Sequence, residues 1–138
     1  MKRPNLIVSI LHLLGIVTLR FRIIPRVFAT WLMAVNLACV FFLGHIEGIV
    51  ALAAAGTAVM GMAIMYQRIQ FTRLLGIFHV LWVPMILWLV SRWDTIAQDQ
   101  ALATWVGLMI ATNIVSLIVD TVDVGRYMRG EKKPSYAW

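Results

Sequence analysis

The sequence predicts an all-α integral membrane protein: a bundle of four transmembrane helices, preceded by an amphipathic helix in the plane of the interface. Three observations predict this class: 62% of the 138 residues are hydrophobic, only 13% are charged, and the mean hydropathy is +0.87. Polar groups could not cover the surface of a water-soluble domain of this composition. The length leaves room for one domain of a few helices and for no large extramembrane domain.

Residues 1–26 are expected to form the interfacial helix and a basic linker. The apolar run at residues 5–19 would make a helix of about 22 Å, which is shorter than the hydrocarbon core of about 30 Å. Polar residues share one narrow face of this helix, as an in-plane helix requires; they are Asn5, Ser9, His12 and Arg20. A short fifth span is the alternative. No small-residue cleavage pattern follows the run, so we expect the segment to be retained.

Four later apolar runs are long enough to cross a bilayer as helices. They cover residues 27–43, 49–66, 74–90 and 101–124, within a bundle that extends from residue 27 to residue 128. Pro84 lies inside the third run and frees the carbonyl group of Val80, so we expect a kink there. Residues 129–138 form a basic tail.

The second run is rich in small residues, which let helix backbones approach closely in a membrane. Several of them recur every four residues and so lie on common faces of the helix. The predicted packing positions are Ala51, Ala54, Ala55, Thr57, Ala58 and Gly61. We therefore expect this helix to be the packed centre of the bundle.

The basic residues predict the orientation of the chain. Eleven of the twelve Lys and Arg residues fall on one side of a four-span arrangement, and only Arg92 falls on the other. By the positive-inside rule, both termini and the second loop are expected to be cytoplasmic. This explains the basic excess without a nucleic-acid partner. Size and charge bias favour a bacterial cytoplasmic (inner) membrane, and contacts with lipid headgroups are expected from Arg20, Arg22, Arg26, Lys132 and Lys133.

The fourth run carries a stripe of polar residues. At about 100° per residue, they fall within about one third of the helix circumference; they are Thr112, Asn113, Ser116, Asp120, Asp123 and Tyr127. The apolar residues Ile114, Ile118 and Val122 point elsewhere. A polar side chain in hydrocarbon is costly unless it has a partner, so this stripe must face other helices, water or a ligand.

Six polar residues could converge in the cytoplasmic half of the membrane: Asn36, His79, Asn113, Ser116, Asp120 and Asp123. In one interpretation the asparagines hydrogen-bond between helices, and the two aspartates pair with Arg26, Arg68 or Arg73. In the other, the residues form a polar pocket, open to the cytoplasm, for an ion, a proton or a small polar ligand. Nothing in their spacing is specific to a metal site, and we expect no metal and no cofactor.

No motif of a known catalytic site occurs in the sequence. The single Cys39 excludes a disulfide or dithiol mechanism within one chain. The chain has no Gly-rich phosphate loop, no HExxH and no GxSxG, so no catalytic residue is predicted. In length and number of spans it is comparable to small dimeric exporters of the small multidrug-resistance type. Those exporters depend on an acidic residue in the first span, where this chain has only Asn36.

Two classes of function follow from these observations. The first is a structural or accessory subunit, or an assembly module, that binds other membrane subunits or a parallel copy of itself through helix–helix packing. The second is a small homo-oligomeric channel or transporter with a cytoplasm-facing polar pocket. We favour the first because no charged residue lies unambiguously at the bilayer centre, where ion-coupled transport usually places one.

Overall fold

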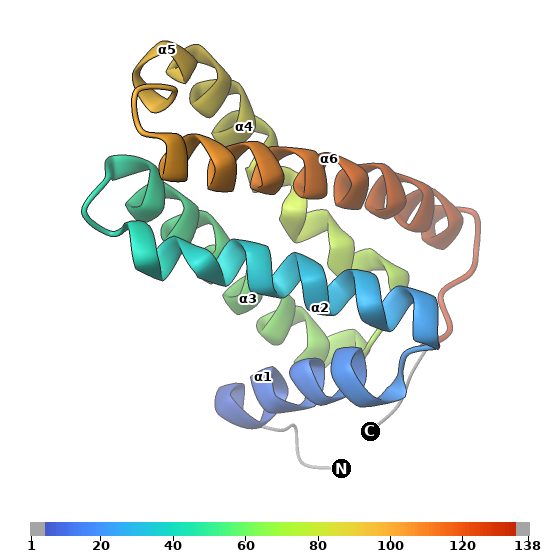
Figure 1. The fold of residues 1–138 in the computed structure, drawn as a ribbon. Helices are drawn as coiled ribbons and strands as arrows, with labels where there is room; N and C mark the ends of the chain where they lie inside the picture. The colour runs from blue at the N-terminus through green and yellow to red at the C-terminus, as the bar shows by residue number, and fades with distance from the viewer. Residues whose placement is uncertain (1–4, 135–138) are drawn as a thin grey trace.

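The structure is a computed structural model that describes residues 5–134 (Figure 1). All the elements of regular secondary structure in this range are helices. Four helical segments are long and apolar enough to cross a membrane: Ile23–Phe42, Ile46–Ile69, Arg73–Ser91 and Gln100–Met128. The prediction of an all-helical chain with four such segments is therefore confirmed. Lys2, Arg3 and the last four residues of the predicted tail lie outside the described range.

The first element of the described range is α1 (Leu6–Gly15), which continues as a π-helical turn, η1 (Ile16–Arg20). The side chain of Asn5 caps α1 by accepting a hydrogen bond of 2.8 Å from the amide of Val8. Ser9 and Leu13 of α1 are buried, whereas Asn5 is exposed and the apolar Ile7 is 71% exposed, so the polar residues do not form one exposed face. The helix is shorter than the four candidate spans, and its in-plane orientation stays a prediction.

The first candidate span consists of α2 (Ile23–Leu37) and the 3₁₀ helix η2 (Ala38–Phe42). A tight turn then leads into α3 (Ile46–Ile69). A Cβ atom at Gly48 would lie 2.2 Å from the carbonyl oxygen of Phe42. The first turn of α3 can therefore fold back against η2 only because residue 48 has no side chain.

The third candidate span changes its helix type along its length. It starts as a nine-residue 3₁₀ helix, η3 (Arg73–Leu81), and becomes an α-helix, α4 (Trp82–Ser91). The irregular part therefore precedes Pro84, where the sequence predicted a kink. A short α5 (Trp93–Ile96) follows in the connection to α6 (Gln100–Met128).

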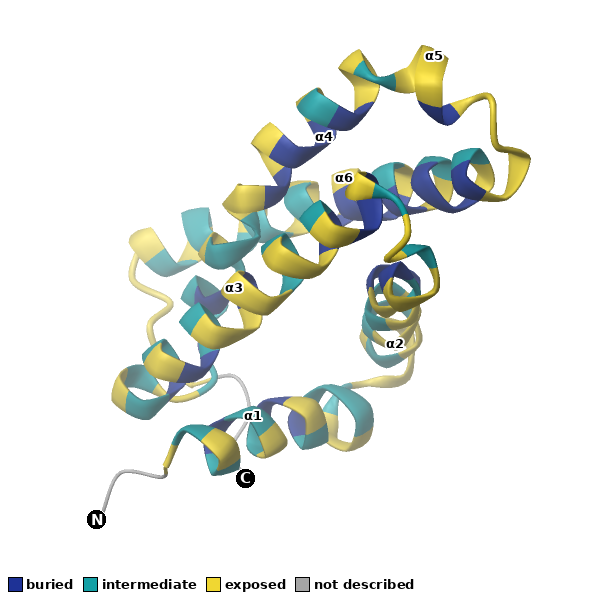
Figure 2. Cartoon of the chain, turned by 90° about the vertical axis from the view of Figure 1, so that its left-hand side faces the viewer, coloured by how far each residue is buried: buried dark blue, intermediate teal, exposed yellow. Residues whose placement is uncertain are grey.

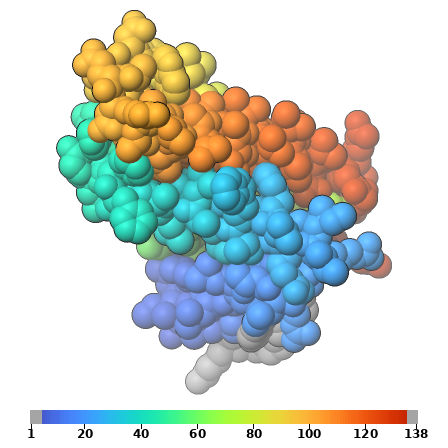
Figure 3. All heavy atoms as spheres, in the orientation of Figure 1, coloured from blue at the N-terminus to red at the C-terminus, as the bar shows by residue number. Residues whose placement is uncertain are grey.

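The main core lies between α6, α4 and the α2–η2 segment. Figure 2 shows buried residues on α4 and α6, and these include the fully buried Leu89, Val106 and Met109. A second core cluster joins α1 to α3 and η3 through Leu13, Ile16, Ala63, Tyr66 and Leu75. On the face drawn in Figure 3, α2 lies between α1 and α6.

The small residues of α3 divide into packed and exposed positions. Ala51 and Ala58 are buried, Ala54 packs against the main core, and Ala55 is half-buried. Gly61 touches η3 so closely that an added Cβ atom would lie 2.3 Å from the ring of Phe78. Thr57 is exposed, and its hydroxyl group bonds to the carbonyl group of Ala53, so it is not a packing position in this chain. The most buried span is α6, and α3 is not the packed centre that the small residues suggested.

Candidate functional site

The polar stripe of α6 faces the other helices, which is one of the three environments that its spacing allowed. Thr112, Asn113 and Ser116 are buried, whereas Ile118 and Val122 are exposed. The six candidate residues do not meet in one pocket, because they form three separate groups along α6. From the middle of the helix toward its C-terminus, these groups are Asn36 with Asn113, His79 with Asp120 and Ser116, and Arg73 with Asp123.

The first group joins α2 to α6 inside the bundle. Asn36 donates a hydrogen bond of 2.8 Å to Asn113, and Asn113 donates one of 3.2 Å in return. At the residue before Asn113, the hydroxyl group of Thr112 accepts a hydrogen bond of 3.1 Å from the indole nitrogen of Trp31. Both asparagine side chains are thus satisfied within the chain, which is the arrangement expected of polar side chains that hold membrane helices together.

The second group joins η3 to α6. Nδ1 of His79 lies 2.7 Å from Oδ2 of Asp120, and the hydroxyl group of Ser116 donates to the same oxygen over 3.3 Å. An ionised carboxylate can only accept hydrogen bonds, so Nδ1 carries the hydrogen atom when Asp120 is ionised. The imidazole ring stacks on the indole ring of Trp82, with 4.1 Å between the ring centroids and 13° between the planes.

The 3₁₀ geometry of η3 explains how these residues come together. In a 3₁₀ helix, residues three apart lie above one another. Arg73, Gly76 and His79 are spaced in this way, and Trp82 follows at the same interval. Along this row, Gly76 leaves the space that Asp120 occupies, because an added Cβ atom would lie 2.3 Å from Oδ1 of the carboxylate.

The third group closes the basic end of the bundle, by which we mean the end at Arg73 and the C-terminus of α6. Arg73 forms an ion pair with Asp123 and a second one, of 3.3 Å, with Glu131. Arg126 also binds Glu131, at 2.9 Å. Hydrogen bonding from Arg126, with the nearby positive charge of Arg73, lowers the pKa of the Glu131 carboxyl group.

The expected arginine partners are therefore only partly correct. Asp123 pairs with Arg73, whereas the partner of Asp120 is His79. Arg26 is engaged elsewhere, because its Nη2 donates to the carbonyl oxygens of Leu19 and Phe21 at 2.8 and 2.7 Å. This arginine holds the connection between η1 and α2.

The residues expected to contact lipid headgroups lie at the same end. Apart from Arg26, which is partly buried, they are exposed: Arg20, Arg22, Lys132 and Lys133. Lys132 also lies over the ring of Tyr127, with 6.0 Å from Nζ to the ring centroid. Contacts between these residues and lipid remain a prediction.

The sequence interpretation missed an ion pair of the buried Glu47 with the partly exposed Arg92, at the opposite end of the bundle. The Glu47 side chain is only 4% exposed, and its Oε1 accepts from Nε and Nη2 of Arg92, both at 3.0 Å. The guanidinium group of Arg92 also lies 5.0 Å from the ring centroid of Trp88. Arg92 is the one basic residue predicted on this side, and that isolation was the signal in the sequence.

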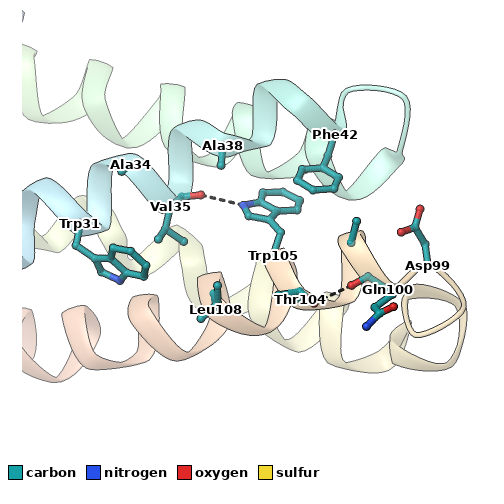
Figure 4. Close-up of a pocket in the computed structure, with 11 residues that line it drawn as sticks. Trp31, Ala34, Val35, Ala38, Phe42, Asp99, Gln100, Thr104, Trp105 and Leu108 are labelled. Carbon is teal, nitrogen blue, oxygen red and sulfur yellow. Dashed lines mark hydrogen bonds between the residues drawn. The ribbon is translucent and has the colours of Figure 1, made fainter.

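An open groove of about 790 Å³ runs between α2 and α6 (Figure 4). Small residues line both walls, with Ala34 and Ala38 on one and Ala101 and Thr104 on the other. Trp105 closes the floor, because its indole nitrogen donates to the carbonyl group of Val35 over 2.9 Å and Phe42 stacks on its ring. None of the six polar candidates lines this groove.

Within residues 5–134, no three His, Cys, Asp or Glu side chains are placed to hold a metal ion together. Comparisons with models of protein families, with curated proteins and with solved structures found no match.

Proposed function

We propose that this protein is a structural or accessory subunit of a membrane complex and that the groove between α2 and α6 receives an apolar transmembrane helix of another subunit. The observation that carries this proposal is the groove itself. Ala34 and Ala38 on one wall, with Ala101 and Thr104 on the other, allow the close backbone approach that drives helix association in membranes. Among the described residues that line the groove, Asp99 at one end is the one charged side chain, so an apolar helix suits the walls.

The use of the polar side chains supports the same proposal. Asn36, Asn113, Asp120 and Asp123 each have a partner inside the chain. Beyond Asn113, the inward face of α6 continues as Met109 and Val106, both fully buried in the apolar core. Among the described residues, this face therefore offers no polar route past Met109 and Val106, which favours helix packing over conduction.

The experiment fills the groove from a position that is exposed in the isolated chain. Ala101 is exposed and lines the groove, whereas Ala53 is exposed on α3 and does not line it. Both the wild type and Ala53→Phe are released from native membranes with a mild detergent. We expect each to run as a complex of the same mass, larger than the 15.6 kDa monomer. Ala101→Phe should lose its partner and keep the thermal stability of the wild type. A wild type that is monomeric, or a complex that Ala101→Phe leaves intact, would refute the proposal.

The second candidate function is a small homo-oligomeric channel or transporter. The contact between His79 and Asp120, two titratable groups inside candidate spans, favours it, because such groups often mark ion or proton pathways. The pathway would lie between copies of the chain, since beyond Asn113 the inward face of α6 is buried in the apolar core at Met109 and Val106. Ion or proton flux into vesicles that contain the purified protein, and loss of that flux in Asp120→Asn, would replace the first proposal with this one.

A further inference from the structure

Trp82 has an unsatisfied donor in the middle of a candidate span. Its side chain is almost fully buried, with 3% of the residue exposed, and its indole nitrogen has no hydrogen-bond partner among the described residues. Trp31 and Trp105 differ, because their indole nitrogens donate to Thr112 and Val35. A buried N–H group without an acceptor is costly, and each such group in a folded protein calls for an explanation.

His79, which stacks on Trp82, has a second unused nitrogen. Its Nδ1 is held by Asp120, and Asp120 is held in turn by Ser116. No hydrogen bond within the described part of the chain uses Nε2. The imidazole ring is thus fixed from one side, while 14% of its side chain is exposed. When Asp120 is ionised, this contact fixes the orientation and the tautomer of the ring, so Nε2 is left as an acceptor.

The depth of the two rings limits what can bind there. The segment Arg73–Ser91 has a length of about 33 Å, and Trp82 begins about 18 Å from its start. The neighbouring Val80 and Val83 are 56% and 43% exposed, so the surface beside the rings is apolar. A charged ligand at this depth is costly. An uncharged, lipid-soluble molecule can approach this surface from the bilayer, and side chains must move to admit its head group, because the indole nitrogen is buried.

We propose that His79 and Trp82 bind the oxygen-bearing head group of an uncharged, lipid-soluble molecule. The indole nitrogen can only donate, so the ligand must offer it an acceptor oxygen. Nε2 of His79 accepts from a hydroxyl group or, when protonated, donates to a carbonyl group. Quinones or quinols and diacylglycerols both have this chemistry. Such binding goes beyond the proposed packing function and does not depend on it.

The test follows the six indole N–H signals of the protein by NMR in lipid nanodiscs. Trp82→Phe identifies the signal of Trp82, and the already bonded Trp31 and Trp105 serve as internal controls. The probes are decylubiquinone, dioctanoylglycerol and the oxygen-free decylbenzene. We expect one of the two oxygen-bearing probes to move the Trp82 signal downfield in a saturable way, which also identifies the source of the oxygen. Decylbenzene should not move it.

A second variant tests the histidine. His79→Phe keeps an aromatic ring to stack on Trp82 and removes both nitrogens, so probe affinity should fall by about tenfold, the loss of roughly one hydrogen bond. If the variant changes the Trp31 and Trp105 signals, Ser116→Ala replaces it, with a smaller loss expected. The proposal is wrong if neither oxygen-bearing probe moves the Trp82 signal or if decylbenzene moves it equally. It is also wrong if water already satisfies the indole and the probes have no effect.

Discussion

His79 Nδ1 lies 2.7 Å from Asp120 Oδ2, and this contact depends on the absence of a side chain at Gly76. A Cβ atom there would lie 2.3 Å from one carboxylate oxygen and 2.8 Å from the carboxylate carbon. Gly76→Ala should therefore push Asp120 away from His79 and lower the free energy of unfolding by about 1–3 kcal/mol, as overpacking does. Thermal unfolding in detergent measures this effect.

Gly125→Ala is the matched control for that substitution. Gly125 also lies within a helix, and no atom comes within 4 Å of an added Cβ at this position. Because alanine is the better helix former by about 0.5–1 kcal/mol, Gly125→Ala should leave stability unchanged or raise it slightly. If both variants lose stability equally, the close approach of Gly76 to Asp120 is not what holds η3 to α6.

The ion pair of Arg73 and Asp123 can be separated from the His79–Asp120 contact by a double-mutant cycle. We expect Arg73→Gln and Asp123→Asn to cost about 1 kcal/mol each and to be non-additive, since the pair lies near water at the basic end. Arg73→Gln combined with Asp120→Asn should be additive. If the second combination is non-additive instead, Arg73 interacts with Asp120, and the Arg73–Asp123 pair and the His79–Asp120 contact are not independent.

The helical periodicity of the sequence predicted the faces of α6 correctly. Hydrophobicity and 3.6-residue spacing are local properties, so they place Asn113 and Ser116 inward and Ile118 outward without knowledge of any neighbour. The partner of each polar residue is a tertiary property. Both His79 and an arginine could satisfy Asp120, and the choice depends on the 3₁₀ form of η3, which no periodicity indicated.

Because local spacing does not reveal tertiary neighbours, the sequence interpretation also misjudged the packing of α3 and missed the Glu47–Arg92 pair at the opposite end of the bundle. Small residues at intervals of four mark a face on which helices can approach, but they do not say whether a neighbour covers it, so Thr57 was assigned to packing although it is exposed. Glu47 and Arg92 lie 45 residues apart, and their contact depends on how two connections meet. Only the scarcity of charge on that side hinted at it.

The pair of Glu47 and Arg92 should be the most sensitive ion pair to truncation. Arg92→Gln leaves a carboxylate that is only 4% exposed without its charged partner, and because the Arg92 side chain is itself 35% exposed, the loss should be about 1–3 kcal/mol, below that of a fully buried pair. Glu47→Gln combined with Arg92→Gln should recover part of this loss. Chemical denaturation of the purified protein measures both effects. Asp94→Asn, at an exposed acid nearby, is the control and should change stability by less than about 0.5 kcal/mol.

The contact of Glu131 with Arg126 and Arg73 should open on acidification. Hydrogen bonding from Arg126 lowers the pKa of this carboxyl group below its ordinary value of 4.5. A lowered carboxyl pKa stabilises the contact fully above that ordinary value, and the stabilisation is lost as the pH falls through the lowered value. A spin label at Lys133 should therefore become more mobile well below pH 4.5. In Glu131→Gln the label should be mobile at every pH. If the mobility of the label in the wild type does not change with pH, the contact of Glu131 with the two arginines is not what orders this segment.

The charge distribution leads to a last prediction, on the orientation of the chain in the membrane. Eleven of twelve basic residues lie on one predicted side, and the positive-inside rule then places that side in the cytoplasm. In a Cys39→Ser background, single cysteines replace Asp94, Arg68 and Lys132, which are all exposed. A membrane-impermeant maleimide added to intact cells should label position 94 alone, and the other two only after the membrane is opened. A cysteine at Asn5, at the start of α1, should also stay protected if α1 lies in plane. Labelling at position 5 together with 94 would make α1 a fifth span, whereas labelling at position 68 before permeabilisation would reverse the orientation.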